Sequence, residues 1–357
     1  MHPDTVRDAP YLLADIGGTN ARFALDLGDS HIERIATLAC VDYPEFTDAV
    51  QAYLAGFVDV PIRHAIVAIA NPVSGDTIKM TNHHWEFSIE ASRRVLGLET
   101  LLVVNDFTAL AMAVPTLTPE QLDKVGGGTA CHGAVIGVVG AGTGLGVAGL
   151  VPSGLRWLPL ESEGGHATFS PVDERELAVL RYSWKQYEHV SAERLVSGSG
   201  IPLIYRALAA QHGDATPANL TAAAIVERAL QGLDGLCRET LECFCGMLGT
   251  VAGNLAVTLS AKGGIYIGGG VVPRLGDYFA TSPFRARFES KGRFSAFNAG
   301  IPTFVITAPF PAFAGASAIL RDHLAEIRRP ASPGPASQHG QHVLGRLQKS
   351  AAPAAPQ

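Results

Sequence analysis

Residues 11–25 read YLLADIGGTNARFAL, two apolar runs on either side of a Gly-Gly turn. This pattern predicts a β-hairpin. The carboxyl group of Asp15 ends the first run, next to two glycines, a hydroxyl and an amide. Glycines let the main chain approach a phosphate closely, and the N–H groups of such a turn form an anion-binding concavity. The stretch is therefore either a plain hairpin or a phosphate-binding turn. In the second case Asp15 could hold Mg²⁺ through water, since Mg²⁺ gives up its waters reluctantly.

The residues after this hairpin predict an α/β domain. Apolar runs predict strands at 31–40, 63–70 and 100–105, and the neighbouring segments predict helices at 44–56, 89–97 and 107–114. Strands that alternate with helices in this way are typical of α/β folds.

The same pattern begins again at residue 133 with GAVIGVVGAGTGLGVAGL, a second strand, glycine turn and strand. The remaining segments predict helices at 173–187, 199–211, 219–230, 233–261 and 312–326, and strands at 264–268 and 302–307. We interpret the two glycine-turn hairpins as a weak internal duplication of one α/β unit. Two phosphate-sized turns that open two such halves would have a nucleotide between them.

Composition limits the class of protein. The chain has 357 residues, 47% of them hydrophobic, which suggests two domains and excludes wholesale disorder. The net charge of −6 argues against a nucleic-acid partner, and the five cysteines are too few and odd in number for a disulfide framework. The N-terminal residues lack the apolar region of a signal peptide, so we expect a cytoplasmic protein. Residues 330–357 are rich in Pro, Ala, Ser and Gln, which predicts a disordered tail.

Two apolar stretches, 132–157 and 244–261, are long enough to span a bilayer. The first is broken by many glycines and is better explained as strand, turn and strand. The second carries Thr250, Asn254 and Thr258 among small residues, as a buried core helix would. We therefore predict no membrane segment.

The dipeptide Asn105-Asp106 follows the apolar run LLVV and precedes a helix. Asp106 can be the N-cap of that helix or a general base at the carboxyl end of a strand, and the two roles are compatible. The chain contains no Walker-type P-loop. A G-x-G-x-x-G pattern starts at Gly144, but Leu-Val-Pro follows it, which indicates a hairpin instead of a dinucleotide site.

Further polar and glycine-rich groups are candidates for ligand binding. Residues 161–166, ESEGGH, place two carboxylates and an imidazole around a double glycine, which favours hydrogen bonds to a polyol over a metal pair without a third ligand. Glu193 lies at a predicted helix start, where a role in capping is the alternative. Residues 268–270, Gly-Gly-Gly, follow a strand, where a flat ring could lie against bare backbone or the chain could simply turn into a helix.

Together these residues form an ordered set of motifs between about Leu12 and Asp322. The set is ADIGGTNARFAL, ANPVSGD, MTNHHW, NDFTALA, GTGLG, EGGH, SAERLVSG and GGGVVP. In this set the chain resembles the bacterial ATP-dependent glucokinases, members of the actin-like sugar kinase superfamily.

The resemblance implies a two-domain α/β fold, the actin-like ATPase (ribonuclease H-like) fold, with a deep interdomain cleft. The small domain would comprise residues 11–116 and 308–328, and the large domain residues 117–307. The implied reaction transfers the γ-phosphate of Mg²⁺-bound ATP to the 6-hydroxyl of glucose, with Asp106 as general base. The resemblance, together with the prevalence of symmetric oligomers, also implies a homodimer.

Site residues carry over by motif. The implied glucose contacts are Asn105, Asp106, Glu163, His166 and Glu193, with Thr81 and Asn82 in a loop that reaches the sugar. The implied ATP contacts are Ala14, Asp15, Ile16, Gly17, Gly18, Thr19, Asn20, Thr143, Gly144, Gly268, Gly269 and Gly270, and Asp15 would hold Mg²⁺ through water. Related repressors and kinases carry a Cys-rich zinc motif near the sugar-binding histidine. None follows His166, so we predict no zinc.

Other functions stay open as alternatives. One is a non-catalytic sugar sensor on the same fold, which would need a DNA-binding segment; the first predicted strand begins near residue 11, so we expect no helix-turn-helix ahead of it. Another is a kinase for a different hexose. A third is an actin-like filament protein, which would not need the sugar contacts.

Overall fold

The computed structural model describes residues 10–28, 31–57, 60–80, 83–214 and 218–328. The chain divides into two compact units, Met1–Leu320 and Arg321–Gln357, and all sites discussed below lie in the first. The predicted sugar contacts Thr81 and Asn82 and the predicted tail at 330–357 lie outside the described residues.

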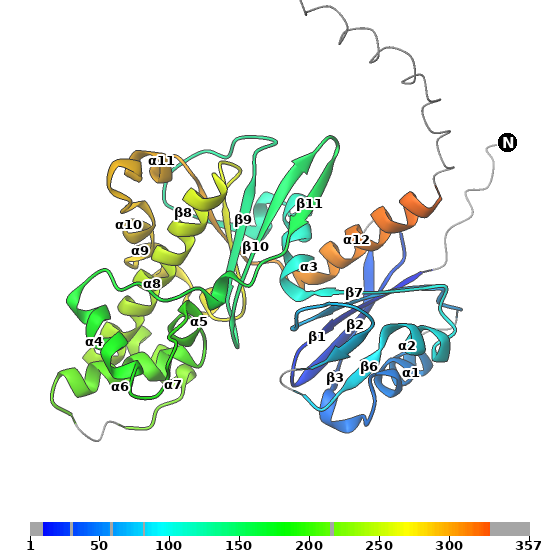
Figure 1. Ribbon diagram of the computed structural model, residues 1–357, viewed down its shortest axis with the longest axis horizontal. Coiled ribbons are helices and arrows are strands. Elements are labelled where there is room, and N and C mark those ends of the chain that lie inside the picture. Colours follow the sequence, from blue (N-terminus) through cyan, green and yellow to red (C-terminus); the bar gives the residue numbers. More distant parts are fainter. Residues whose placement is uncertain (1–9, 29–30, 58–59, 81–82, 215–217, 329–357) are drawn as a thin grey trace, which may run out of the picture. The chain divides into compact units, whose positions relative to one another are not determined.

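Five of the described strands form the first sheet, in the order β3-β2-β1-β4-β7 (Figure 1). Their bounds are β1 (Tyr11–Ile16), β2 (Asn20–Asp26), β3 (Ile32–Ala39), β4 (His64–Ile69) and β7 (Thr100–Asn105). The first three strands are antiparallel neighbours, whereas β1, β4 and β7 run parallel. The hairpin predicted at 11–25 is therefore confirmed, and β1 is the central strand.

The second sheet repeats this arrangement, in the order β11-β10-β9-β12-β13-β8. Its strands are β8 (Leu122–Val125), β9 (Ile136–Ala141), β10 (Leu145–Ser153), β11 (Arg156–Leu160), β12 (Ile265–Gly268) and β13 (Thr303–Ile306). Again three antiparallel neighbours, β9 to β11, adjoin two parallel strands, and β8 adds an antiparallel edge. The shared strand order confirms the predicted duplication at the level of topology.

Twelve α-helices lie among the described residues. Their bounds are α1 (Phe46–Phe57), α2 (Ile89–Val95), α3 (Asp106–Ala113), α4 (Glu174–Ser183), α5 (Ala192–Leu195), α6 (Gly200–Gln211), α7 (Ala222–Leu230), α8 (Gly235–Leu259), α9 (Asp277–Thr281), α10 (Phe284–Glu289), α11 (Ser295–Ala299) and α12 (Pro311–Ile327). One apolar core joins the first sheet to α1 through Phe23 and Tyr53. A larger core surrounds α8, which packs against α6, α7 and α10.

Both apolar stretches of the sequence have the structures predicted for them. Residues 132–157 contain the hairpin of β9 and β10. Helix α8 is long and apolar enough to cross a membrane by length and composition, but 72% of its most apolar window is buried within the protein. Burial of this extent is typical of a core helix in a folded domain.

Several short elements were not predicted. They are β8, β11, α9, α10, α11 and the small two-stranded sheet of β5 (Thr77–Lys79) and β6 (Glu86–Ser88). Elements of three to six residues are too short to show a hydrophobic period, so their conformation depends on tertiary contacts. Helix α4 also ends at Ser183, four residues before its predicted end.

Helix α12 contacts the first sheet. The hydroxyl of Ser317 donates a hydrogen bond to the carboxylate of Asp26, which is buried at the end of β2. This contact supports the expectation that the closing helix belongs with the N-terminal residues. The boundaries at 11–116, 117–307 and 308–328 stay a prediction.

Candidate active site

Two aspartates lie at the same edge of the first sheet. Strands β1, β4 and β7 are parallel, so their carboxyl ends meet there. Asp15 is near the end of β1, and Asp106 directly follows β7. Both line a cavity of about 280 Å³, together with Gly268 and Gly269 at the end of β12. The fold therefore brings three of the predicted motifs to one cavity.

Asn105, not Asp106, caps helix α3. The backbone of Asn105 is extended, and its Oδ1 accepts hydrogen bonds from the N–H groups of Phe107 at 2.9 Å and Thr108 at 3.3 Å. The interpretation of Asp106 as the N-cap is therefore wrong, because Asp106 is already the first helical residue. The Nδ2 of Asn105 also donates to the carbonyl of Asn71 at 3.2 Å, which leaves one N–H for a ligand.

The environment of Asp106 raises its pKa to about 7. The main cause is burial, which disfavours the charged carboxylate; the negative charges of Asp15 and Glu163 add to it. The N–H of Phe107 donates to Oδ1 of Asp106 and opposes the shift. A carboxylate with a pKa near the pH of the cell is suited to proton transfer.

Asp15 has a partner that sequence reasoning missed. The Nη1 of Arg22 lies 3.1 Å from Oδ2 of Asp15, and the two residues face each other across the β1–β2 hairpin. Burial raises the pKa of Asp15, while the charge of Arg22 lowers it. A tight turn at residues 17–19 places position 22 opposite position 15 on the neighbouring strand. The register of the predicted hairpin would therefore have been enough to predict the Asp15–Arg22 ion pair.

The first glycine turn presents free N–H groups. The N–H of Gly17 closes the turn by donating to the carbonyl of Asn20 at 3.0 Å. Within the described chain, the N–H groups of Gly18 and Thr19 have no hydrogen-bond acceptor. By contrast, Ala14 and Ile16 are fully buried core residues of β1. The turn residues are therefore the part of this motif that can contact an anion.

The second glycine turn shares this property. The N–H of Gly142 donates to the carbonyl of Gly144, and no acceptor among the described residues pairs with the N–H groups of Thr143 and Gly144. The glycine run 268–270 lies beside this turn. A Cβ at Gly269, which has φ of +81°, would lie 2.3 Å from the carbonyl oxygen of Ala141. Only glycine allows the two backbones to approach so closely.

The predicted sugar contacts Glu163, His166 and Glu193 lie together. The Nε2 of His166 is 4.0 Å from Oε2 of Glu163 and 4.0 Å from Oε1 of Glu193. Glu193, on α5, also accepts a hydrogen bond from the N–H of Leu145 through Oε2 at 3.0 Å. A Cβ at Gly144 would lie 2.4 Å from that oxygen. The absence of a side chain at Gly144, in the second glycine turn, therefore makes room for the carboxylate of Glu193.

Two contacts join α3 to the second sheet and so place Asp106 near this cluster. Gly146 of β10 leaves space for the ring of Phe107, since a Cβ there would lie 2.0 Å from the ring. The hydroxyl of buried Thr108 donates to Oε1 of Glu161 at 3.3 Å, and Glu161 follows β11 as the first residue of the ESEGGH loop. The sequence contained no signal for the Thr108–Glu161 pair, because 53 residues separate its members.

The segment between β13 and α12 was also missed. Thr307 and Phe310 line the same cavity as Asp15 and Asp106. Phe310 has φ of +49°, a left-handed backbone that is rare for a bulky residue. The stretch follows a strand without any ligand-type motif, so only the tertiary structure shows its position.

No group of three or more His, Cys, Asp or Glu side chains that could hold a metal ion is found in the described parts of the chain. The five cysteines are free, and Cys243 and Cys245 are buried in α8. Asp15 lines the cavity and keeps Oδ1 outside its ion pair with Arg22, so this oxygen can contact a ligand.

Comparison with known proteins identifies the family of the chain. The profile of the glucokinase family, described as "Glucokinase", matches residues 12–323. The chain is 60% identical over 317 residues to the bifunctional protein glk of Burkholderia pseudomallei, a match that covers 89% of this chain and 49% of that protein. This chain thus spans about half the length of the first curated relatives it matches.

A second relative is matched over nearly its whole length. The glucokinase of Neisseria meningitidis serogroup C is 52% identical over 325 residues, covering 91% of this chain and 99% of that one. Among solved structures, a glucokinase from an Antarctic psychrotroph superposes with a TM-score of 0.79 at 37% identity, covering 88% of this chain and 99% of that one. The predicted actin-like ATPase fold is confirmed. With its ordered motifs, its paired glycine turns and this match over most of its length, the chain belongs to the glucokinase family.

Proposed function

We propose that this chain transfers the γ-phosphate of ATP to the 6-hydroxyl of glucose, giving glucose 6-phosphate and ADP. The observation that carries the proposal is the environment of Asp106. This carboxylate has a pKa of about 7 and lines a cavity together with Asp15 and the backbone of Gly268 and Gly269. Phosphoryl transfer requires mainly positioning and charge stabilisation, and both turn backbones and carboxylates can supply these.

In the proposed step, Asp106 accepts the proton of the sugar 6-hydroxyl. The hydroxyl oxygen forms a bond to the γ-phosphorus while the bond between that phosphorus and the β,γ-bridging oxygen breaks, and ADP leaves with the bond's electron pair. The N–H groups of Gly18 and Thr19 and those of Thr143 and Gly144 would donate to phosphate oxygens, because none has a partner in the described chain. Residues 268–270 would lie along the adenosine.

Glucose would be held by groups that still have hydrogen-bonding capacity. Glu193 keeps Oε1, Asn105 keeps one N–H, and Glu163 and His166 are both exposed. A site that pairs each sugar hydroxyl with such a group discriminates against analogues that lack the hydroxyl.

Magnesium fits the chemistry of Asp15. Mg²⁺ prefers oxygen ligands and is usually bound by one or two carboxylates, substrate phosphates and several waters. Asp15 supplies one carboxylate at the cavity that would receive the phosphates. When bound, the ion would neutralise charge on the transferred phosphoryl group. The cytoplasmic location and the homodimer stay predictions.

The test is ADP release from Mg·ATP, measured with and without each of several hexoses at millimolar concentration. We expect strong stimulation by glucose. Stimulation by another hexose instead would make the protein a kinase for that sugar. Absence of stimulation by any hexose, with glucose binding still detected by calorimetry, would contradict the catalytic proposal and favour a sugar sensor.

Replacing Glu163 with glutamine should chiefly weaken glucose binding. The substitution keeps the shape of the side chain and one acceptor oxygen but removes the charge, and charge-assisted hydrogen bonds are about twice as strong as neutral ones. We expect KM for glucose to rise by about tenfold, with KM for ATP unchanged. Steady-state kinetics at varied glucose checks this, with the exposed Glu174→Gln on α4 as control. An unchanged glucose KM would remove Glu163 from the sugar site.

The pH profile should report the state of Asp106. A carboxyl group can act as a general base only in its ionised form. The value of kcat/KM should therefore rise with pH, reach half of its maximum near pH 7 and level off above that. Because the charge of Glu163 raises the pKa of Asp106, Glu163→Gln should move this midpoint to lower pH. The measurement is kcat/KM for glucose between pH 5 and pH 9. A profile that is flat from pH 5 to pH 9 in the wild type would mean that the pKa of Asp106 is not raised as proposed.

A further inference from the structure

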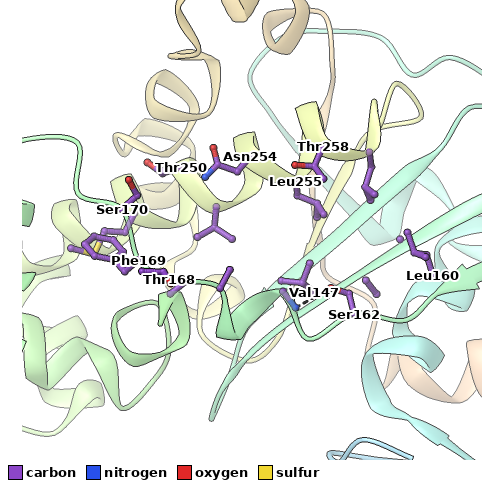
Figure 2. Close-up of a pocket in the computed structure, with 18 residues that line it drawn as sticks. Val147, Leu160, Ser162, Thr168, Phe169, Ser170, Thr250, Asn254, Leu255 and Thr258 are labelled. Carbon is purple, nitrogen blue, oxygen red and sulfur yellow. Dashed lines mark hydrogen bonds between the residues drawn. The ribbon is translucent and has the colours of Figure 1, made fainter. Parts of the chain in front are cut away.

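A second cavity, of about 290 Å³, lies beside residues 161–168 (Figure 2). We call this segment the sugar loop, because it carries the proposed glucose contacts Glu163 and His166. It is bounded on one side by β10 and by the segment that runs from Ser162 to Ser170, and on the other by α8. Its volume is at the small end of the range for ligand pockets, about 300–1,000 Å³. The cavity does not include any residue of the proposed phosphate or sugar contacts, so the function proposed above leaves it unexplained.

The sugar loop has two sides. Glu163 and His166 belong to the sugar cluster, whereas Gly164, Ala167 and Thr168 line this cavity. At Gly165 the loop is packed tightly against β10, because a Cβ there would lie 1.9 Å from the carbonyl oxygen of Leu145. Ala167 and Thr168 instead border the cavity. A molecule in the cavity would therefore touch the same loop that would hold the sugar.

The wall formed by α8 is amphipathic. Thr250, Asn254 and Thr258 follow one another at intervals of four residues and so share one face of the helix. Val251 and Leu255 run beside them, and all five residues line the cavity. Figure 2 shows Asn254 and Thr258 on the helix above the strand that carries Val147. Such a wall matches a ligand that has both an apolar body and a polar group.

Two polar groups on this wall are exposed and open to a ligand. The Oδ1 of Asn254 accepts a hydrogen bond from Nζ of Lys291 at 2.8 Å, and none of the described residues accepts from its Nδ2. The hydroxyl of Thr258 makes no hydrogen bond within the described part of the chain. None of the described lining residues carries a charge. The ammonium of Lys291 lies beside this wall, but it already donates to Asn254 and to the carbonyl of Thr250. With no charge on the lining itself, the cavity favours an uncharged ligand.

We propose that this cavity is a regulatory site for a small uncharged molecule with an apolar one- or two-ring body and a hydroxyl or carbonyl group. The ring would lie against Val251 and Leu255, and its polar group would bond to Asn254 or Thr258. By filling the space behind Ala167 and Thr168, the molecule restricts the sugar loop before glucose arrives, which lowers the ordering cost of glucose binding. The effect of this molecule on glucose binding rests on the proposed function, whereas the existence of the binding site is independent of it.

The test uses 2-naphthol as the probe and 2-naphthalenesulfonate, its charged counterpart with the same rings, as control. Calorimetry should show 2-naphthol binding to the full chain with a Kd below about 1 mM and much weaker binding of the sulfonate. Val251→Trp, which fills the cavity, should weaken 2-naphthol binding by at least about tenfold. Thr258→Phe, at an exposed position on the rim, is the second blocking variant should Val251→Trp not fold. Equal binding by the wild type and a folded blocking variant would overturn the proposed site.

The coupling is measured separately, as the Kd for glucose with and without saturating 2-naphthol and without ATP. We expect glucose to bind about fivefold more tightly with the probe present, and no such change in the blocking variant. An unchanged or weaker glucose affinity would overturn the regulatory role. Failure of glucose to bind at all would instead refute the proposed function. It would leave the cavity site standing, because binding of 2-naphthol to the cavity is measured without sugar.

Discussion

Replacing Asp106 with asparagine should lower kcat by about 10²–10⁴-fold, the usual contribution of a general base, and leave the Kd for glucose nearly unchanged. Asparagine has the same shape and keeps an oxygen that can accept from the N–H of Phe107, as Oδ1 of Asp106 does. It cannot accept the proton of the 6-hydroxyl. Steady-state kinetics gives kcat, and calorimetry gives the glucose Kd.

The matched control is Asp123→Asn, the same chemical change on an exposed residue of β8, for which we expect wild-type kcat. Wild-type turnover in Asp106→Asn would remove the proposed base. A large loss of glucose affinity with little loss of kcat would make Asp106 a binding group only.

Asp106→Asn should also change how the stability of the protein depends on pH. The folded-state pKa of Asp106 is about 7, above its ordinary value of 3.8, so the native state holds a proton that the unfolded chain releases between these values. The contribution of Asp106 to stability therefore falls as pH rises from about 4 to about 7. Asp106→Asn has no such proton to lose. Its melting temperature relative to the wild type should rise over this pH interval, and a constant difference would contradict the raised pKa.

Gly165→Ala should damage the sugar site without touching a predicted contact. The new Cβ would lie 1.9 Å from the backbone carbonyl oxygen of Leu145, which no side-chain movement can relieve. Either the loop or β10 must shift, and a displacement of about 1 Å at a positioned group can cost about 10²-fold in rate. We therefore expect kcat/KM for glucose to fall by about 10²-fold, with a rise in glucose KM.

The overpacking also has a cost in folding, typically about 1–3 kcal/mol. Thermal unfolding should show a lower melting temperature for Gly165→Ala. Gly56→Ala is the control, because it adds the same methyl group to an exposed position of α1 where nothing lies within 4 Å. That variant should keep wild-type kinetics and be slightly stabilised, since alanine favours helix. Equal glucose kinetics in the two variants would show that the close contact at Gly165 does not position the sugar loop.

The predictions made from sequence succeeded where the signal was local. A turn of two glycines between apolar runs has few conformations available, so the hairpins at residues 11–25 and 133–150 followed directly from the pattern. The long core helix was also predicted, as 233–261 against the observed Gly235–Leu259. Short elements such as α9 and β8 were missed, because their few residues lack a period and adopt their conformation through packing.

The residues of the site divide in the same way. Sequence by itself determined which groups are candidates for the chemistry. Asp15 and Asp106 were singled out because they lie at strand ends, and Glu163, His166 and Glu193 because their motifs match those of a known family. Only the tertiary structure decided how they act. The pKa of Asp106 depends on burial and on Asp15 and Glu163, which are distant in the chain. Charge and desolvation act through space, so no reading of neighbours along the chain could supply them.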